Sequence, residues 1–531
     1  MEIKVLSSLS KVFDDEICNE NTIGSLTGLK GEKLSFQIAI KSDNSCKVQL
    51  ASNNDKVSFY NIGFVPAKLA APKGHDNYYI RGAKQGLYPD LLIPNANEVE
   101  LKKDEWVSIW CEFCSDEKFN DKIEINVGEY KASIEIEIFD VDFPDQKLIC
   151  TQWFHTDCLA AYYDIDVFSD EYWHVVENFM KMAAEYGVNF ILTPIFTPPL
   201  DTKVGGERPT VQLVNVEVVG ENKYKFGFDN FVKWVRLAQK CGIKYFEMAH
   251  LFTQWGAKHA PKIMAKTSSG EKRIFGWDTK ASSKEYKCFL EQFSVEFTKV
   301  IDELGIHNEC YFHTSDEPML KDYFKYKKSS NITKHCFSSF KQIDAISEYS
   351  FYKKGFCDIA IPSIQHIDKF AGKVDELWTY YCCLPYNGNY PNRFNAMPSL
   401  RNRITGVVLY KYDVKGFLHW GYNFYFSQYS KGLIDPFKTS DAGGAFSSGD
   451  AFLVYPGTNG VPYPSIRFKV FYEAIRDYEA LKMLEDKIGR QRVIELLEKD
   501  IAEPIKANVY PHSEQWLLNK RNEVNSLLSN V

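Results

Sequence analysis

The 531-residue sequence has no run of about 18 apolar residues, so no segment is predicted to span a bilayer as a helix. It also lacks a long basic block, and its 63 basic and 70 acidic side chains give a net charge of −7. A polyanion would meet net repulsion, which disfavours nucleic acid and anionic membranes as partners. Residues 1–7 lack a basic stretch followed by an apolar core, so we expect no secretory signal.

Paired cysteine motifs are almost absent. The 13 cysteines are an odd number and are scattered, apart from Cys111/Cys114 and Cys382-Cys383. Such scattered thiols are typical of a reducing compartment, and we expect a cytoplasmic protein without a disulfide framework. Cys111-Glu-Phe-Cys114 lies in an alternating, strand-like stretch without a second pair, which favours a structural role over a metal or redox site.

Aromatic residues are plentiful, at 15% of the chain. Most must be buried, but a surplus of this size can line a site that stacks on the apolar faces of sugars. Hydrophobic residues make up 45% and charged residues 25%, a mixture typical of globular proteins. The chain is long enough for more than one domain.

Residues 1–147 are predicted to form an N-terminal β-sandwich. Period-two alternation of apolar and polar residues marks strands at 34–40, 106–113 and 132–139, and Gly, Asn, Asp and Lys clusters separate them. No amphipathic helix of useful length is visible in this part. Two packed sheets are the natural way to bury such strands.

Residues 148–465 alternate between strands and helices and predict a (β/α)₈ barrel similar to triosephosphate isomerase. Helices are expected from Asp170 to Gly187, from Asp229 to Gly242, and from an N-cap at Ser283 to a stop at Gly305. Eight short apolar strands, the number that closes such a barrel, are expected at 152–155, 190–193, 244–248, 310–313, 342–346, 358–362, 377–381 and 416–420.

Residues 466–531 are predicted to be a helical extension that packs on the barrel. Helical periodicity covers 466–488, 491–499 and 513–528, with breaks at Gly489, Pro504 and Pro511. These segments are too short to form a core of their own.

The chemistry of a barrel enzyme lies at the carboxyl ends of its strands. The fourth predicted strand ends in His313-Thr-Ser-Asp316-Glu317-Pro318. Adjacent carboxylates repel each other, and partial burial favours protonation of one of them, as a general acid requires. The alternative is a surface Asp-Glu-Pro at a helix start, where acidic residues interact favourably with the helix dipole.

Other strand ends supply polar and aromatic side chains. Taken singly, each is more typical of a core or supporting position than of a ligand. Together they predict a polar pocket with an aromatic floor, which suits a sugar. The candidates are His155 and Asp157 after strand one, His250 after strand three, His313 on strand four, Trp378, Tyr380 and Tyr381 on strand seven, and Trp420 and Asn423 after strand eight.

A separate catalytic nucleophile is missing from the seventh strand. Asp375 and Glu376 precede that strand, and Glu348 after strand five is the one spare carboxylate. A 2-acetamido group of the substrate can replace the nucleophile and form an oxazolinium. The enzyme then needs an acid/base and a neighbouring carboxylate that orients the amide, which fits Asp316 and Glu317.

The segment around Asp316-Glu317 resembles the catalytic motif of glycoside hydrolase family 123, the β-N-acetylgalactosaminidases. Segments similar to this family lie over about 85–480, and we identify the resemblance on the set rather than on any one piece. They are Gly86-Leu-Tyr-Pro-Asp-Leu-Leu-Ile-Pro94, Tyr390-Pro-Asn-Arg-Phe394, Gly416-Phe-Leu-His-Trp-Gly-Tyr-Asn423, and Pro464-Ser-Ile-Arg467 with Arg476-Asp-Tyr-Glu479.

The resemblance implies an exo-acting, retaining, substrate-assisted hydrolase of terminal β-linked N-acetylgalactosamine, without a metal or cofactor. It implies that Asp316 orients the acetamido group and stabilises the oxazolinium, and that Glu317 is the acid/base. Tyr380, Trp420 and Asn423 are suited to acetamido contact and sugar stacking. Asn395 and His419 replace an expected acid and an expected aromatic, which would alter the rim of the site rather than its chemistry.

Three alternatives remain open. A metal-dependent barrel hydrolase would need His-x-His on strand one, where this chain has His155-x-Asp157, and further histidines where it has only His366. A non-catalytic sugar-binding barrel would not need both Asp316 and Glu317. A retaining glycosidase for another sugar would use Glu348 as its nucleophile.

Overall fold

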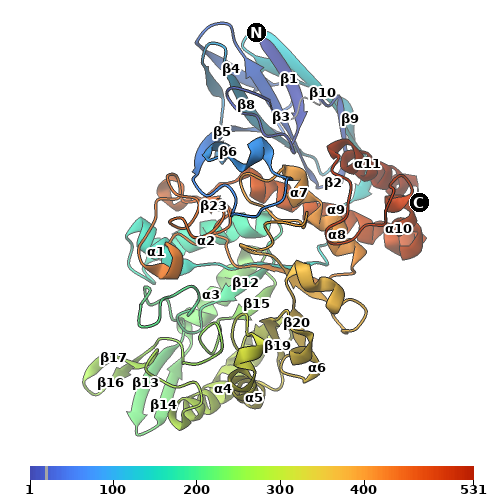
Figure 1. Cartoon of the computed structure of the whole chain (residues 1–531). Helices are drawn as coiled ribbons and strands as arrows, with labels where there is room; N and C mark the ends of the chain where they lie inside the picture. Colours follow the sequence, from blue (N-terminus) through green and yellow to red (C-terminus); the bar gives the residue numbers. More distant parts are fainter. Residues whose placement is uncertain (18–21, 531) are drawn as a thin grey trace.

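The computed structural model describes residues 1–17 and 22–530 (Figure 1). Two N-terminal sheets lie at one end of the molecule, the barrel lies at the other, and the C-terminal helices lie beside the junction. No helix in the described ranges combines the length and the apolar character needed to cross a membrane.

The N-terminal region consists of two five-stranded sheets, with strand orders β1-β3-β8-β5-β6 and β2-β10-β9-β4-β7. Their inner faces share one apolar core that includes Phe36 and Ile109 from the first sheet and Ile125 and Ile136 from the second. Each predicted strand of this region is present, within β3, β8 and β10. The strands are β1 (Glu2–Ser7), β2 (Ser25–Lys30), β3 (Lys33–Lys41), β4 (Cys46–Ser52), β5 (Val57–Ala67), β6 (Gly86–Pro94), β7 (Glu98–Leu101), β8 (Trp106–Cys114), β9 (Phe119–Val127) and β10 (Tyr130–Asp142).

Eight parallel strands then form a nearly closed barrel, in the order in which they follow one another along the chain. Between β20 and β21 the pairing is reduced to a bridge at Ser363 and Tyr380, with the Tyr380 N–H donating to the Pro362 carbonyl at 3.1 Å. The strands are β11 (Ile149–Gln152), β12 (Phe190–Thr193), β15 (Tyr245–Met248), β18 (Cys310–Phe312), β19 (Lys341–Ala345), β20 (Ile359–Ile361), β21 (Trp378–Tyr380) and β22 (Gly416–His419).

Two features of the barrel differ from the prediction. The first strand lies at 149–152, three residues before the predicted start, so residues 153–155 belong to the loop after it. A four-stranded sheet grows out of the loops after β12 and β15 and projects at the lower left of Figure 1. Its strands are β13 (Asn215–Gly220), β14 (Lys223–Gly227), β16 (Ile263–Thr267) and β17 (Gly270–Phe275). The prediction contains none of these four strands, although apolar and polar residues alternate along both β13 and β14.

The predicted barrel helices are present with their caps. Helix α4 (Lys284–Leu304) begins after Ser283, whose hydroxyl accepts from the Tyr286 N–H, and ends at Gly305 with a φ of 67°. Helices α2 (Asp170–Glu185) and α3 (Asp229–Lys240) match their predicted ranges to within two residues. The others are α1 (Thr156–Tyr163), α5 (Tyr323–Cys336), α6 (Tyr349–Lys353), α7 (Ser399–Arg403) and α8 (Thr405–Lys411).

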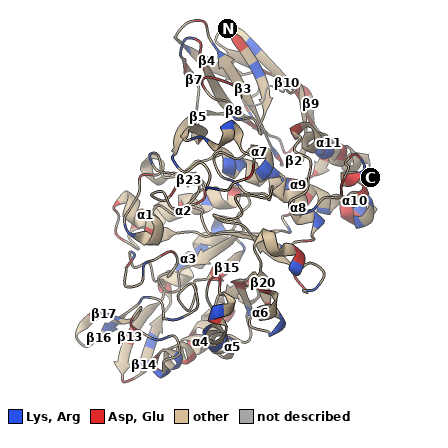
Figure 2. Ribbon diagram, viewed as in Figure 1, with Lys and Arg blue, Asp and Glu red and all other residues tan. Residues whose placement is uncertain are grey.

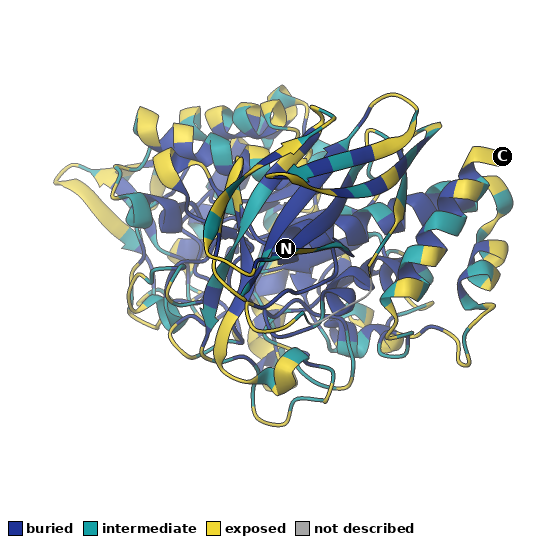
Figure 3. Cartoon of the chain, turned by 90° about the horizontal axis from the view of Figure 1, so that it is seen from above, coloured by how far each residue is buried: buried dark blue, intermediate teal, exposed yellow. Residues whose placement is uncertain are grey.

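The C-terminal helices do more than pack on the barrel. Helix α9 (Ile466–Ile488) is buried on nearly all sides and contacts α7 and α8 of the barrel as well as β6 of the N-terminal sheets. Helix α10 (Arg490–Glu498) packs on α9, and α11 (Glu514–Asn530) packs on β2 and β10. Figure 3 shows the buried core beneath the N-terminal sheets, with exposed residues along the outer helices.

Buried ion pairs explain why α9 can lie inside the molecule. Arg467 contacts Asp90 of β6 at 2.9 Å, and Lys469 contacts Glu112 of β8 at 3.0 Å. On the barrel side, Asp477 accepts from Arg403 of α7 at 2.8 Å. The basic segments near α7 and α9 stand out in Figure 2. Two motifs that carried the family resemblance, one with Asp90 and one with Arg467, are therefore an anchor between the two halves of the protein.

Candidate active site

A cavity that is open to solvent lies at the carboxyl ends of the barrel strands. Loops after six strands contribute to its wall, and the wall combines aromatic and carboxylate side chains. Predicted site residues on it are Asp316, Glu317, Tyr380, Trp420 and His155. Trp153, Leu200, Asp201, Gln254, Trp255, Cys382 and Cys383 are among the other lining residues.

Asp316 and Glu317 lie side by side at this cavity, in the loop between β18 and α5. The Tyr380 hydroxyl donates to Oε1 of Glu317 at 2.5 Å. Glu317 has a φ of 42°, a strained conformation for a residue with a Cβ, and such strain concentrates at functional sites. Burial and the neighbouring Glu317 charge raise the pKa of Asp316 well above its usual value. The protonated form of Asp316 is therefore favoured at this position.

A charged network lies beneath this pair. His313 Nε2 contacts Glu247 Oε1 at 2.5 Å, and His313 Nδ1 contacts Asp344 Oδ1 at 3.1 Å. Burial alone lowers the pKa of His313, but the hydrogen bonds to Asp344 and Glu247 outweigh it and raise the pKa to about 9. Asp344 also accepts from the backbone N–H groups of Thr314 and Ser315, at 3.0 and 3.2 Å. The network thus fixes the backbone that leads into Asp316.

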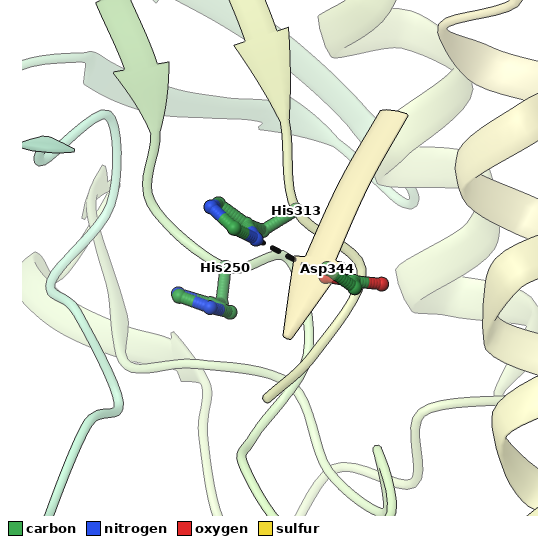
Figure 4. A group of neighbouring side chains, drawn as sticks. All are labelled: His250, His313 and Asp344. Carbon is green, nitrogen blue, oxygen red and sulfur yellow. Dashed lines mark hydrogen bonds and ion pairs between the residues drawn. The ribbon is translucent and has the colours of Figure 1, made fainter. Parts of the chain in front are cut away.

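His250 completes the only candidate metal cluster found in residues 1–17 and 22–530. Its ring stacks on His313 with centroids 4.3 Å apart, and both of its nitrogens lack a hydrogen-bond partner. Figure 4 shows His250 beside His313, with the dashed bond running from His313 to Asp344. Both nitrogens of His313 are engaged by carboxylates, so it holds protons rather than a free lone pair. The cluster of His250, His313 and Asp344 therefore suits a protonated His313 better than a metal ion. Neither histidine is among the residues lining the cavity.

His155 reaches the cavity wall but is held by protein groups. Its Nε2 contacts the Trp420 carbonyl at 2.8 Å, and its Nδ1 contacts Arg208 at 3.3 Å. Burial and the Arg208 charge lower the pKa of His155 to about 4, so it is a neutral histidine. Arg208 in turn pairs with Asp157 at 2.5 Å. This group shapes the wall after β11.

Trp420 also forms part of the cavity wall, and buried polar side chains hold it in place. Its indole N–H donates to Asp450 Oδ2 at 3.0 Å. Beneath it, Arg393 donates to His419 Nδ1 at 2.6 Å and to Gln152 Oε1 at 2.7 Å. Burial, followed by the Arg393 charge, lowers the pKa of His419 well below its usual value. The aromatic surface therefore rests on a buried network in which the histidine is neutral.

Besides His250 and His313, two further predicted substrate contacts do not reach the cavity. Asn423 is buried and bonds at both ends to the backbone of His155, accepting at 2.8 Å and donating at 3.1 Å. Trp378 lies at the amino-terminal end of β21, where it packs over Gly416 and bonds to Glu376 at 2.8 Å. Asn423 thus joins two loops of the barrel, and Trp378 belongs to the bottom of its core.

Expectations about three further residues also need correction. Asn395 and His419 are fully buried, so they support the site from beneath and do not form its rim. Glu348 directly precedes α6 without a capping side-chain hydrogen bond, and it is absent from the cavity wall. Its charge acts on His366, whose pKa is lowered mainly by burial.

Sequence reasoning missed Asp201 and Gln254. Both lie on the wall, and Gln254 Oε1 accepts from the Asp201 N–H at 2.7 Å. The Nε2 of Gln254 is buried without a protein partner, so this amide can donate to a substrate. Burial raises the pKa of Asp201. Both residues come from long loops without a strand-end pattern, and only their place in the folded chain reveals them.

Comparison with known proteins agrees with this geometry. A family model described as glycoside hydrolase 123, catalytic domain, matches residues 153–484. A solved family 123 glycoside hydrolase from Clostridium perfringens, described for glycolipid glycan hydrolysis, aligns with 100% of this chain and 98% of its own. Its sequence identity is 17% and its TM-score is 0.74.

Other matches are more distant. A cyclomaltodextrinase aligns with 90% of this chain and 84% of its own, at 9% identity and a TM-score of 0.32. A family 2 enzyme from Bacteroides cellulosilyticus aligns with 82% of this chain and 48% of its own, at 9% identity and a TM-score of 0.27. No curated protein sequence matches the chain. Because the family 123 model matches more than half of it, the chain belongs to glycoside hydrolase family 123.

Proposed function

We propose that this glycoside hydrolase releases terminal β-linked N-acetylgalactosamine by a retaining, substrate-assisted mechanism. The observation that carries the proposal is the adjacent Asp316 and Glu317 at the cavity, with the Tyr380 phenol bonded to Glu317. The Clostridium perfringens enzyme acts on glycolipid glycans, which supports a glycan or glycolipid as the substrate class.

In this mechanism Asp316 orients the acetamido group and Glu317 is the acid/base. In the free enzyme Asp316 holds a proton, because burial and the adjacent charge raise the pKa of that carboxyl. An acetamido N–H that donates to Asp316 favours its ionised form, and the proton is then available to Glu317. Glu317 protonates the leaving oxygen, the acetamido oxygen attacks the anomeric carbon, and Asp316 stabilises the oxazolinium.

Tyr380 and Trp420 would bind the same sugar. Once substrate enters, the Tyr380 hydroxyl turns from Glu317 to the acetamido carbonyl, which leaves the Glu317 oxygen free to hold the proton. Trp420 offers an aromatic surface to an apolar sugar face. Gln254, through its unpartnered Nε2, supplies a further donor to a sugar hydroxyl.

The strongest competing mechanism uses a protein nucleophile. Asp201 is the one further carboxylate among the described residues that line the cavity, so it replaces Glu348 in that role. A retaining enzyme of this kind places its two carboxyl groups about 5–5.5 Å apart and does not need an acetamido group on the substrate.

Initial rates on three aryl glycosides separate the two mechanisms: 4-nitrophenyl β-N-acetylgalactosaminide, its gluco epimer, and the β-galactoside without an acetamido group. We expect turnover of the first and none of the plain galactoside. Asp316→Asn should lower kcat by about 10²–10³-fold, while Asp201→Asn should have a smaller effect. Turnover of the galactoside that depends on Asp201 and not on Asp316 would overturn the proposal.

Glu317→Gln gives an independent check of the acid. Its loss should be large for natural glycosides with poor leaving groups and smaller for activated aryl glycosides, because protonation matters less when the leaving group is good. An equal loss on both substrate classes would contradict the assignment of Glu317 as the acid.

A further inference from the structure

Two adjacent cysteines, Cys382 and Cys383, lie on the wall of the same cavity. They follow β21 directly, two and three residues after Tyr380. Their sulfur atoms are 3.8 Å apart, and both residues are half-buried, so they are reachable from the cavity. No second pair of sulfur atoms is in contact within residues 1–17 and 22–530. Neither the proposed mechanism nor the family assignment uses these thiols.

The turn that carries the two thiols is held in place. The Cys382 N–H donates to the Leu384 carbonyl at 2.8 Å. The side chain of Asn392 donates to the carbonyls of Cys382 and Pro385, both at 2.9 Å. Because one buried amide binds both ends of the turn, the two sulfur atoms stay together at the wall.

A disulfide between these residues is disfavoured. Adjacent Cα atoms are about 3.8 Å apart, whereas disulfides usually join Cα atoms about 4.4–6.8 Å apart. Strained disulfides are also easily reduced, so the pair remains a dithiol. The contact with Cys383, together with burial, raises the pKa of the Cys382 thiol well above its usual value. It is therefore a poor nucleophile toward reagents that attack one thiolate at a time.

We propose that Cys382 and Cys383 form a binding site for trivalent arsenicals, which are thiophilic electrophiles that take two thiols at once. An organic arsenic(III) oxide forms two S–As bonds and loses its As–O bonds. The oxygen leaves as water with both thiol protons, and nothing is oxidised or reduced. The two sulfur atoms, already side by side on a fixed turn, need little rearrangement to hold one arsenic atom.

The bound group would also block catalysis, a consequence that rests on the proposed function. Tyr380 and Glu317 belong to the same wall as the two thiols, and the Glu317 charge acts on Cys382. An arsenical on this pair therefore occupies space that the sugar needs.

Native mass spectrometry of the full chain with phenylarsine oxide tests the site without reference to activity. We expect one adduct per chain that survives excess 2-mercaptoethanol and is removed by 2,3-dimercaptopropanol. Cys382→Ser and Cys383→Ser should each lose the resistant adduct. Cys288→Ser, which changes a half-buried single cysteine on α4, should keep it. A resistant adduct that persists in both variants, or none in the wild type, overturns the site.

The rate of hydrolysis of the aryl N-acetylgalactosaminide tests whether the bound arsenical blocks catalysis. We expect the arsenical to lower the wild-type rate at least tenfold and to leave Cys383→Ser within twofold of its own untreated rate. An adduct that forms without inhibition would contradict the proposed block of catalysis but not the proposed binding site. Adduct formation by a wild type that hydrolyses none of the aryl glycosides counts against the proposed function, not against the site.

Discussion

Two buried histidines occupy similar places beneath the cavity but have opposite charge states. His313 follows β18 and lies between Glu247 and Asp344, and its pKa is raised to about 9. His419 ends β22 and contacts Arg393, and its pKa is lowered well below the ordinary value. Both are fully buried, so burial does not distinguish them. The charges next to each histidine account for the opposite shifts of the two pKa values.

The difference matches what each side of the cavity has to support. One side of the cavity carries Asp316 and Glu317 (the acid side). There the positive charge of His313 partly offsets the carboxylates that surround Asp316, and it lowers the pKa of Asp316 relative to burial alone. On the side that carries Trp420 (the stacking side), the Arg393 charge disfavours a second positive charge on His419. The carboxylate nearest to His419, Asp450 at 3.3 Å, has its own pKa raised to about 7 by burial. The pKa of Arg393 is itself lowered to about 9, mainly by burial. The same residue type thus serves as a cation in one network and as a neutral acceptor in the other.

The largest expected effect comes from removing His313 from its network with Glu247 and Asp344. His313→Gln leaves Glu247 and Asp344 buried without their cation, and breaking such a pair costs about 3–5 kcal/mol. His419→Gln removes a neutral acceptor and should cost about 1–3 kcal/mol. Thermal and urea unfolding of both variants measures the difference, with the exposed His335→Gln as a control near zero. Equal losses at the two sites would show that the charge states do not differ.

Raising the pH should break the same network without mutation. A histidine whose folded pKa lies above its unfolded value stabilises the fold at low pH and loses this contribution as the pH rises through the folded pKa. For His313 the window runs from about 6.5 to about 9. Between about pH 7.5 and pH 9 the free energy of unfolding should fall by roughly 2 kcal/mol.

The control compares how steeply the free energy of unfolding falls with pH in each variant, and not the absolute value of that free energy. His313→Gln should lose most of the decline between about pH 7.5 and pH 9, whereas His419→Gln should keep it, because neutral His419 does not titrate there. A decline of the same size in His313→Gln would assign the effect to other groups.

Much of the fold follows from sequence periodicity. The helix at 284–304 has three phenylalanines at four-residue spacing and a serine and a glycine at its ends, and all of these signals are local. The first barrel strand begins three residues before its predicted start, because the apolar Trp153 and Phe154 resemble strand residues although they lie in the loop after Gln152. Helix α9 was expected on the barrel surface. Its burial depends on ion pairs with residues hundreds of positions away, such as Asp90.

The site was predictable where its residues end strands, as for Asp316, Glu317, Tyr380 and Trp420. Asn423 and Trp378 have suitable chemistry at suitable positions, but one bonds to backbone and the other faces the bottom of the barrel. Sequence does not give the direction of a side chain in a loop. Sequence patterns do not reveal Asp201 and Gln254 for a related reason, since each lies in a long loop and reaches the cavity wall only in the folded chain.

Tyr380→Phe tests the role of the phenol that donates to Glu317. The variant loses the donor to Glu317 in the free enzyme and, in the proposed complex, the donor to the acetamido carbonyl. We expect kcat/KM on the aryl N-acetylgalactosaminide to fall about 10–100-fold, equal to about 1.4–2.7 kcal/mol. Tyr381→Phe changes the next residue, which does not line the cavity, and should change kcat/KM less than threefold. A similar loss in both would point to disturbance of β21 rather than to the phenol.

The smallest effect on turnover is expected on the stacking side. Trp420→Phe keeps an aromatic face but loses the bond to Asp450, so KM should rise only a few-fold, about 1 kcal/mol or less, with kcat nearly unchanged. Trp378→Phe should leave KM unchanged and lower the free energy of unfolding by about 1–2 kcal/mol, because the smaller ring leaves space beside Gly416. Steady-state kinetics and unfolding of both variants separate the two roles. A raised KM in Trp378→Phe would return that residue to the substrate site, and an unchanged KM in Trp420→Phe would remove Trp420 from it.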